Sequence, residues 1–293
     1  MLGIGVGGAD AVDAMTGMPW ELQCPKTIGV RLTGQLNGWA SSKGKRLWSR
    51  LDSVANTLLD IMLKLAGLIS VSGGKGKVIE FFGPGTQGLG ATAMATVCNM
   101  SAEVGSTSCI FPYSDRIARY LEATNRDFIA SAANANSNLL TADDGSDKFY
   151  DEVIDINLDT LEPHINGPFT PDLSHPLSQF AANVQKSDWP QDISHALIGS
   201  CTNASYEDLS KAARIFREAN EAGLKPKVPV FVTAGSEKIR ATVESEGILD
   251  DFERAGAVVL SNSCGPCVGQ WHRHGAEKVR KCRFASYGLT LTF

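Results

Sequence analysis

The sequence predicts an α/β protein made of βαβ units on parallel sheets. In the second half of the chain, short apolar runs of strand length alternate strictly with longer runs of helix length. The chain has 293 residues and is 43% hydrophobic, so it can bury one large core or two ordinary ones. Strand–helix–strand alternation implies a parallel sheet with right-handed crossovers, so the strands point the same way.

The first half of the chain has a less regular order of elements. Six elements are expected there: a strand at 27–32, an apolar helix around 58–69, a strand at 77–82, a helix from about Ala91, and helices at 114–123 and 126–133. The run 163–172 (PHINGPFTPD) then ends this half, because three prolines in nine residues interrupt any regular element.

The second half carries the strict alternation. Six elements are expected in it: strands at 196–198, 228–233 and 257–260, and helices at 206–222, 237–245 and 249–255. Two helix starts have their own signals. Ser205 with Asp208 resembles a capping box, and Ser236 stands before Glu237 as an N-cap.

Charge and composition argue against several classes of protein. A net charge of −5 and a pI of about 5.6 provide no basic field for nucleic acid or an anionic membrane. No apolar run approaches the roughly 20 residues that span a bilayer, and the first residues do not resemble a targeting segment. Seven cysteines, an odd number spread over a long chain, favour a reducing compartment and a metal or reactive-thiol role.

Three cysteines follow predicted strands at their carboxyl ends. Cys201 lies in 199–203 (GSCTN), and Cys264 and Cys267 lie in 263–267 (SCGPC). Since the carboxyl ends of parallel strands share one edge of the sheet, we expect the three thiols to converge there. Three thiolates would leave one iron of a four-iron cluster open, and an open iron can act as a Lewis acid toward hydroxide. The pattern therefore predicts the iron–sulfur site of a dehydratase.

Two other interpretations of these cysteines stay open at this point. CGPC is also a thioredoxin dithiol sequence, although only 26 residues follow Cys267. Zinc could be held if His272 or His274 completed a Cys3His set. The remaining cysteines are expected to be small buried hydrophobes or, for the last one, a tail thiol: Cys24, Cys98, Cys109 and Cys282.

The chain closely resembles the aconitase family over most of its length. The matching stretches are residues 5–11 (GVGGADA), 18–22 (MPWEL), 98–103 (CNMSAE), 163–172, 199–203 and 262–267 (NSCGPC). The resemblance implies a [4Fe–4S] enzyme that interconverts citrate and isocitrate through cis-aconitate, with Cys201, Cys264 and Cys267 as cluster ligands. It also implies that Asn99 lies near the cluster and that Glu103 bonds to the iron-bound water. Without the resemblance, Asn99 would be interpreted as an amide at a helix end and Glu103 as a solvated acid.

The resemblance also suggests a division of the chain. Residues 1–24 are expected to be the remnant of a first domain, 25–163 a second α/β domain, 164–271 a third α/β domain with the cluster cysteines, and 272–293 a divergent tail. Residues 44–59 are expected to be an insertion, either a surface loop or a translated intron. The family's carboxylate-binding arginines and serine base have no counterpart, so weak or absent turnover is expected.

Several alternatives and partners complete these expectations. The nearest alternative enzymes are dehydratases that act on isopropylmalate or homocitrate. A cluster-free RNA-binding relative is a second class, against which the net charge argues, and an inert fragment is a third. The expected partner is a small tricarboxylic acid, the expected state a monomer without membrane contact, and the expected location the mitochondrion.

Overall fold

The computed structural model describes residues 2–4, 8–19, 23–36, 58–265 and 267, and it confirms the α/β class. The chain forms two compact units. The first unit comprises residues 1–164 and 171–176, and the second comprises 165–170 and 177–293. No helix in the described ranges is both long enough and apolar enough to cross a membrane.

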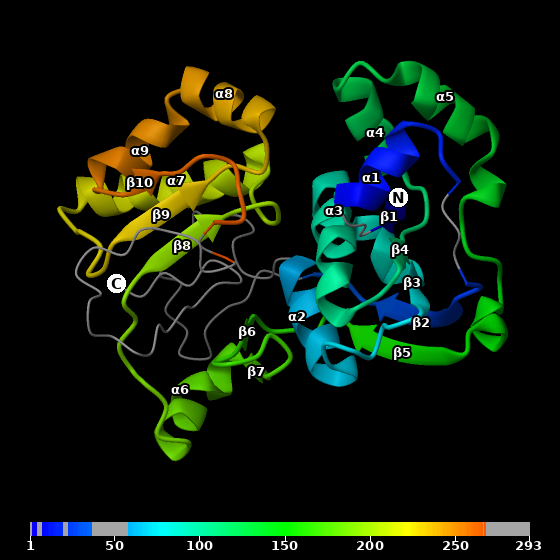
Figure 1. The fold of residues 1–293 in the computed structure, drawn as a ribbon, viewed down its shortest axis with the longest axis horizontal. Coiled ribbons are helices and arrows are strands. Elements are labelled where there is room, and N and C mark those ends of the chain that lie inside the picture. The colour runs from blue at the N-terminus through cyan, green and yellow to red at the C-terminus, as the bar shows by residue number, and fades with distance from the viewer. Residues whose placement is uncertain (1, 5–7, 20–22, 37–57, 266, 268–293) are drawn as a thin grey trace. The chain divides into compact units, whose positions relative to one another are not determined.

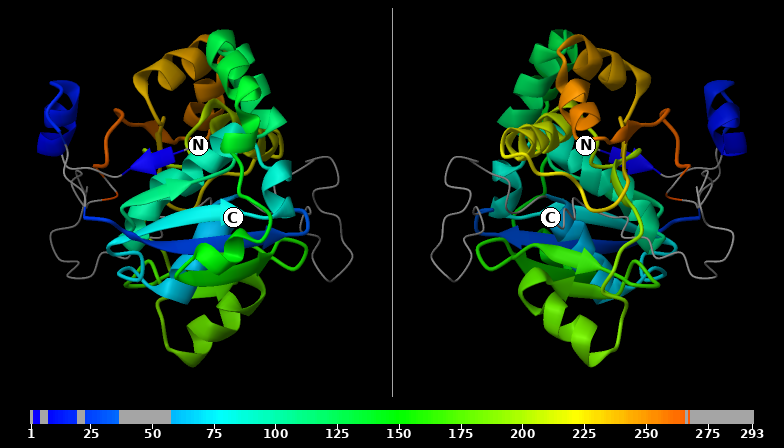
Figure 2. Two further views of the ribbon diagram at one scale, coloured as in Figure 1. Left: turned by 90° about the vertical axis from the view of Figure 1, so that its right-hand side faces the viewer. Right: turned by 90° about the vertical axis from the view of Figure 1, so that its left-hand side faces the viewer.

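The first unit is built on a five-stranded sheet in the order β1-β4-β3-β2-β5 (Figure 1). Its strands are β1 (Leu2–Ile4), β2 (Lys26–Thr33), β3 (Lys77–Phe82), β4 (Ser108–Ile110) and β5 (Glu152–Asn157). β2, β3, β4 and β5 are parallel, and β1 pairs with β4 in the antiparallel sense. Figure 2 shows β2 in blue and β3 in cyan side by side.

Helices connect these strands. They are α1 (Gly8–Met15), α2 (Leu58–Ile69), α3 (Ala91–Met100), α4 (Asp115–Ala123) and α5 (Asp127–Ala135), with the short 3₁₀ turns η1 (Pro84–Gly88), η2 (Ser101–Val104), η3 (Ser137–Leu139) and η4 (Ser146–Phe149). The β2–α2–β3 and β3–α3–β4 crossovers move in the same direction across the sheet, and α2 packs against α3.

The core of the first unit lies along its central strands. Ile28, Val30 and Leu32 of β2 have no exposed surface, and Gly29, between two of them, is also buried. A strand covered on both faces is expected to be apolar at successive positions, as here. Phe81 of β3 stacks on Phe111 with ring centroids 4.4 Å apart.

Two further short strands, β6 (His164–Asn166) and β7 (Ser174–Pro176), form a two-stranded sheet. Within the first unit, the backbone N–H of His164 donates to Oδ1 of Asp60, at 2.8 Å. Asp60 is buried in the first turn of α2. This bond links the first turn of α2 to the backbone at His164.

The second unit has a three-stranded parallel sheet in the order β10-β9-β8. The strands are β8 (Ala196–Gly199), β9 (Val230–Thr233) and β10 (Val258–Val259), and the helices are α6 (Leu177–Lys186), α7 (Tyr206–Glu221), α8 (Glu237–Ser245) and α9 (Ile248–Arg254). Ser205 and Asp208 form the predicted capping box, and the Ser236 side chain accepts from the Ile239 N–H. Both cap predictions are confirmed.

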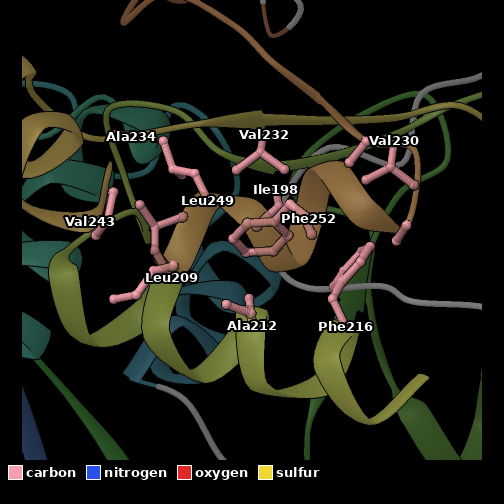
Figure 3. Packing of buried hydrophobic residues seen from close by; sticks show 14 residues of the cluster. Ile198, Leu209, Ala212, Phe216, Val230, Val232, Ala234, Val243, Leu249 and Phe252 are labelled. Carbon is pink, nitrogen blue, oxygen red and sulfur yellow. The ribbon is translucent and has the colours of Figure 1, made fainter. Parts of the chain in front are cut away.

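The core of the second unit lies between this sheet and its helices (Figure 3). Ile198, Val230 and Val232 of the sheet are buried in one cluster with residues of α7 and α9. Phe216 of α7 and Phe252 of α9 contact each other within it, with ring centroids 5.0 Å apart. The alternating apolar runs of the sequence therefore form one continuous core in this unit.

Some elements were not expected from the sequence. β1, β4, β6 and β7 have three residues each, and β10 is shorter than the strand predicted at 257–260. The helices α1 and α6 were also missed, although they are similar in length to the predicted helix α8. β5 was missed because its sequence EVIDIN mixes acidic with apolar residues, and only Ile156 is fully buried. It is an edge strand, so its exposed positions tolerate charge.

The predicted insertion and tail fall largely outside the described residues. Residues 44–57 and 272–293 are not described, whereas Leu58 and Leu59 belong to α2 and Leu59 is buried. The last two positions assigned to the insertion are therefore part of a regular helix. The division of the chain into four parts stays a prediction, although β1, from residues 1–24, joins the sheet of the first unit.

Candidate functional site

The two cysteine loops of the second unit leave the same edge of its sheet. β8 and β10 flank β9, and all three strands are parallel, so their carboxyl ends lie together. Cys201 comes two residues after the end of β8, and Cys264 comes five residues after the end of β10. The topology on which the convergence argument depends is thus present (Figure 1).

The loop that holds Cys201 has an unusual backbone. Gly199, Ser200 and Asn203 all have positive φ, at 90°, 122° and 53°. A Cβ atom on Gly199 would overlap the carbonyl oxygen of Thr233, which also accepts a hydrogen bond from the Ser200 N–H at 3.3 Å. Non-glycine residues at positive φ are uncommon and concentrate at functional sites. Glycine is therefore required where β8 turns into the cysteine loop.

The three candidate thiols are accessible to solvent. Cys201 and Cys264 are exposed, Cys267 is partly exposed, and none of the six cysteines that the structure describes forms a disulfide. The Cys201 Sγ lies 3.5 Å from the Thr202 hydroxyl, within hydrogen-bonding distance. Accessible thiols can exchange protons with solvent and bind a metal.

The other cysteines divide differently from the expectation. Cys98 and Cys109 are buried, as expected of small apolar residues, but Cys24 is exposed, so the expectation for Cys24 is wrong. Its segment, just before β2, places the side chain at the surface of the first unit. Cys282, like His272 and His274, lies outside the described residues.

The residue types at the site fit an iron–sulfur cluster, but the positions of their side chains, as far as the structure describes them, do not form a closed ligand set. Soft thiolates are the usual ligands of such clusters, and three accessible thiols lie on loops at one sheet edge. Within the described ranges, however, no group of three or more Cys, His, Asp or Glu side chains is gathered closely enough to hold a metal ion. The ligand set therefore stays a prediction.

One hydrogen bond holds the second cysteine loop to a helix. Nδ2 of Asn262 donates to Oε2 of Glu237, at 2.5 Å, two residues before Cys264. Glu237 is the first residue of α8, which follows β9. This pair was not among the predicted site residues. The signal for it was Glu237 itself, an acidic residue beginning a helix at the same sheet edge as the cysteines.

Asn99 and Glu103, the other predicted site residues, lie in the first unit. Asn99 is exposed in the last turn of α3, and Glu103 is exposed in η2, directly after it. Buried serines shape this corner, since Oγ of Ser101 donates to the Cys98 carbonyl at 2.7 Å and Oγ of Ser106 donates to the Ser101 carbonyl at 2.9 Å. The two polar side chains thus project from a hydrogen-bonded turn.

The Glu103 carboxyl has a shifted pKa. Partial burial of the carboxyl, despite the exposure of the residue as a whole, raises its pKa above the ordinary glutamate value. Desolvation penalises the charged form, so Glu103 retains its proton to higher pH than a solvated glutamate does. A carboxyl of this kind suits proton transfer.

Comparison with known proteins supports these assignments at the level of the family. The profile of the aconitase family (aconitate hydratase) matches residues 1–286, a range that includes most of the predicted tail. The mitochondrial homocitrate dehydratase of Saccharomyces cerevisiae is 52% identical over 96% of this chain and 34% of its own length. The mitochondrial aconitate hydratases of Schizosaccharomyces pombe and Emericella nidulans are 50% and 52% identical, over 96% and 94% of this chain and 33% of each relative. The chain spans about a third of the length of these curated relatives.

Proposed function

This chain belongs to the aconitase family, and from that premise we propose that it is part of a hydro-lyase that interconverts citrate and isocitrate through cis-aconitate. The supporting observation is about 50% identity, over nearly the whole chain, to proteins named aconitate hydratase. A match of this length is far more specific than a short cysteine motif, because it includes the helices and strands on which the candidate residues lie.

We propose that Cys201, Cys264 and Cys267 hold a [4Fe–4S] cluster. Their accessibility and their position on loops at one sheet edge support this assignment. When bound, the cluster supplies a Lewis acid that makes hydroxide a feasible leaving group. The same donor set would bind zinc, so the identity of the metal is part of the test.

The polypeptide would contribute proton handling and orientation. Because its pKa is raised by burial, the Glu103 carboxyl keeps its proton to higher pH than an ordinary glutamate does, and in its protonated form it can donate to a departing hydroxyl. The Asn99 amide, close by in sequence at the end of α3, can donate a hydrogen bond to a substrate oxygen. The positive-φ loop after β8 would fix the direction of Cys201.

We expect these 293 residues alone to turn citrate over slowly. A positioned general base contributes about 10²–10⁴-fold to such a reaction. The base and the carboxylate-binding arginines that the family resemblance implies were not found in this sequence. Near-normal turnover by the isolated polypeptide would contradict this part of the proposal.

Cluster assembly is the direct test of the ligand set. The protein is reconstituted anaerobically with iron and sulfide. Absorbance, EPR and the number of iron and zinc atoms bound per polypeptide are then measured. Wild type is expected to assemble a cluster and Cys264→Ser to lose its signal, while Cys24→Ser, which removes an exposed thiol of the first unit, is the matched control. An unchanged signal in Cys264→Ser would exclude Cys264 as a ligand, and zinc bound in place of iron would reject the cluster.

Homocitrate is the second candidate substrate. A protein named homocitrate dehydratase is as similar to this chain as the aconitate hydratases are, so identity does not separate the two activities. The separating measurement is kcat/KM for citrate and homocitrate with the full-length protein that contains this chain. A preference for homocitrate of tenfold or more, about 1.4 kcal/mol in transition-state binding, would replace the citrate proposal.

We also propose a mitochondrial location. The relatives described above are all named as mitochondrial proteins. Fractionation of cells that express the full-length protein tests this location, and recovery in the cytosolic fraction alone would contradict it.

A further inference from the structure

A pair of cysteines in the first unit is not used by the proposed mechanism. Cys98 lies in α3 and Cys109 in β4, and the two side chains are 6% and 0% exposed. The Cys98 Sγ donates to the backbone carbonyl of Cys109 at 3.6 Å, so its sulfur contacts the backbone of the second cysteine. Neither cysteine forms a disulfide in the structure.

The two thiols also interact with each other, and unequally. The neighbouring Cys109 lowers the pKa of Cys98, whereas the neighbouring Cys98 and burial both raise the pKa of Cys109. Cys98 therefore loses its proton at a lower pH than Cys109 does. Such an arrangement of an attacking thiolate beside a second thiol is typical of cysteines that oxidise reversibly.

We propose that Cys98 and Cys109 form a peroxide-sensitive pair that closes to an intramolecular disulfide. The Cys98 thiolate attacks one oxygen of hydrogen peroxide, the O–O bond breaks, and Cys98 sulfenic acid and hydroxide result. The Cys109 sulfur then attacks the sulfenic sulfur, its proton leaves with the hydroxyl as water, and the S–S bond forms. Two thiols lose two electrons in total, and one peroxide is reduced to two waters.

Burial determines which oxidant can act on this pair. Hydrogen peroxide is far smaller than a disulfide such as oxidised glutathione, so of the two it is the oxidant expected to reach residues that are 6% and 0% exposed. Burial also keeps Cys98 sulfenic acid away from external thiols, so Cys109 is the partner at hand. Cys24, Cys201 and Cys264 are exposed and should form mixed disulfides instead.

The closed ring would contain both Asn99 and Glu103, because they lie between the two cysteines in sequence. Oxidation would join α3 to β4 across the turn that presents these side chains. Only this consequence for activity rests on the proposed function. The disulfide itself can be observed in protein that holds no cluster and has no turnover.

The sequence provides a direct readout by mass spectrometry. Trypsin leaves both cysteines in one peptide, residues 78–116, since no lysine or arginine precedes Arg116 in it. Glu103 is the sole glutamate between them, so cleavage after glutamate separates Cys98 from Cys109 unless a disulfide joins them. The native chain is treated with peroxide and is then unfolded in urea with N-ethylmaleimide, which blocks all remaining thiols, including those buried in the native chain. The blocked chain is then digested.

In wild type, we expect the two fragments produced by cleavage at Glu103 to stay linked. The intact tryptic peptide should be lighter by two hydrogens and should carry two fewer thiols that can be blocked. Dithiothreitol should reverse all three changes. Cys109→Ser should lose the link, with Cys98 recovered as a sulfenic or higher oxide. Cys24→Ser, the control, should keep it. Wild type oxidised in urea should instead give a mixture of pairings.

Two outcomes would overturn the proposal. One is full oxidation of Cys24 or Cys201 while Cys98 and Cys109 remain blockable thiols. The other is a link from Cys98 to any cysteine but Cys109 in the native chain. Cluster assembly in Cys109→Ser is measured separately, so a failure of the disulfide and a failure of the cluster proposal give different results.

Discussion

At the scale of single residues, the backbone around Cys201 depends on a glycine. Gly199 ends β8 at a φ of 90°, and its α-carbon faces the Thr233 carbonyl on the neighbouring strand so closely that no side chain fits. The same turn leads Ser200 into a positive φ before Cys201. The direction of the cysteine loop is therefore set by backbone sterics.

Gly199→Ala is expected to destabilise the second unit by more than about 2 kcal/mol, since it adds a backbone overlap to the cost of a left-handed residue. Gly223→Ala is the matched control. Gly223 also has positive φ, at 70°, but a Cβ there meets nothing within 4 Å, so it should cost only about 1 kcal/mol. Urea unfolding of both variants measures the difference in the free energy of unfolding. Equal losses would show that the Thr233 backbone moves aside easily.

Glu103 makes stability depend on pH. Its raised pKa means that the folded chain binds the proton more tightly than the unfolded chain. This contribution to stability is complete below the ordinary glutamate pKa and is lost as pH rises through the raised pKa. Glutamine stays neutral throughout, so Glu103→Gln should gain stability relative to wild type as pH rises from about 4 to about 7.

Thermal melting of wild type and Glu103→Gln at both pH values measures this gain. Glu122→Gln, the same charge change at an exposed position of α4, reports the part that comes from net charge alone. A Glu103→Gln gain no larger than that of Glu122→Gln would mean that burial of the carboxyl has no energetic effect.

At the scale of elements, a buried carboxylate connects two helices of the second unit. Nη2 and Nε of Arg217, in α7, donate to Oδ2 of Asp251, in α9, at 2.6 and 3.0 Å. The Asp251 side chain is 2% exposed, and Nη2 of Arg254 lies 3.7 Å from its other oxygen. Such a pair differs from a surface ion pair, because removing the arginine leaves a buried charge behind.

Arg217→Ala should therefore lower stability by about 1–3 kcal/mol, below the usual loss for a fully buried pair because the Arg217 side chain is 54% exposed and Arg254 remains. Lys211→Ala on the same helix removes an exposed pair with Glu207 and should cost less than about 0.5 kcal/mol. Urea unfolding of the two variants provides the comparison. Equal losses would mean that water reaches Asp251 once the arginine is gone.

At the scale of the whole molecule, the chain has two units, each with its own sheet and core. Phe81 and Phe111 belong to the first core, and Phe216 and Phe252 to the second. The five-stranded sheet lies in the first unit and the three-stranded sheet in the second. A cavity made in one core should therefore affect mainly the unit that contains it.

Phe252→Ala is expected to lower the stability of the second unit by about 3–5 kcal/mol, because it removes a side chain with no exposed surface. Amide hydrogen exchange should become faster in β8, β9 and α7 and change little in β2 and β3. Phe128→Ala removes a side chain that is 74% exposed and serves as the control. Faster exchange throughout both units would show that they unfold as one.

Much of the fold could be predicted from particular residues. The helices at 58–69 and 237–245 and the strand at 77–82 have the bounds that the sequence predicts, because their apolar spacing is regular and turn residues flank them. β4 was missed because its sequence, Ser-Cys-Ile, contains only one residue with a strong strand preference, and β5 because its acidic residues lie on an exposed edge. The loops of the candidate site could be predicted because they follow strands, whereas the Glu237–Asn262 bond could not, because its partners are distant in sequence.

By itself, the sequence determined the α/β class, the family and the identity of the candidate residues, since these depend on local pattern and on motifs within continuous stretches. Only the tertiary structure decided that Cys24 is exposed, that Cys98 lies against Cys109, and that Gly199 faces Thr233. The physical reason is the same in each case. Exposure and close approach depend on which distant segments pack together, and a local pattern records only the preferences of each segment.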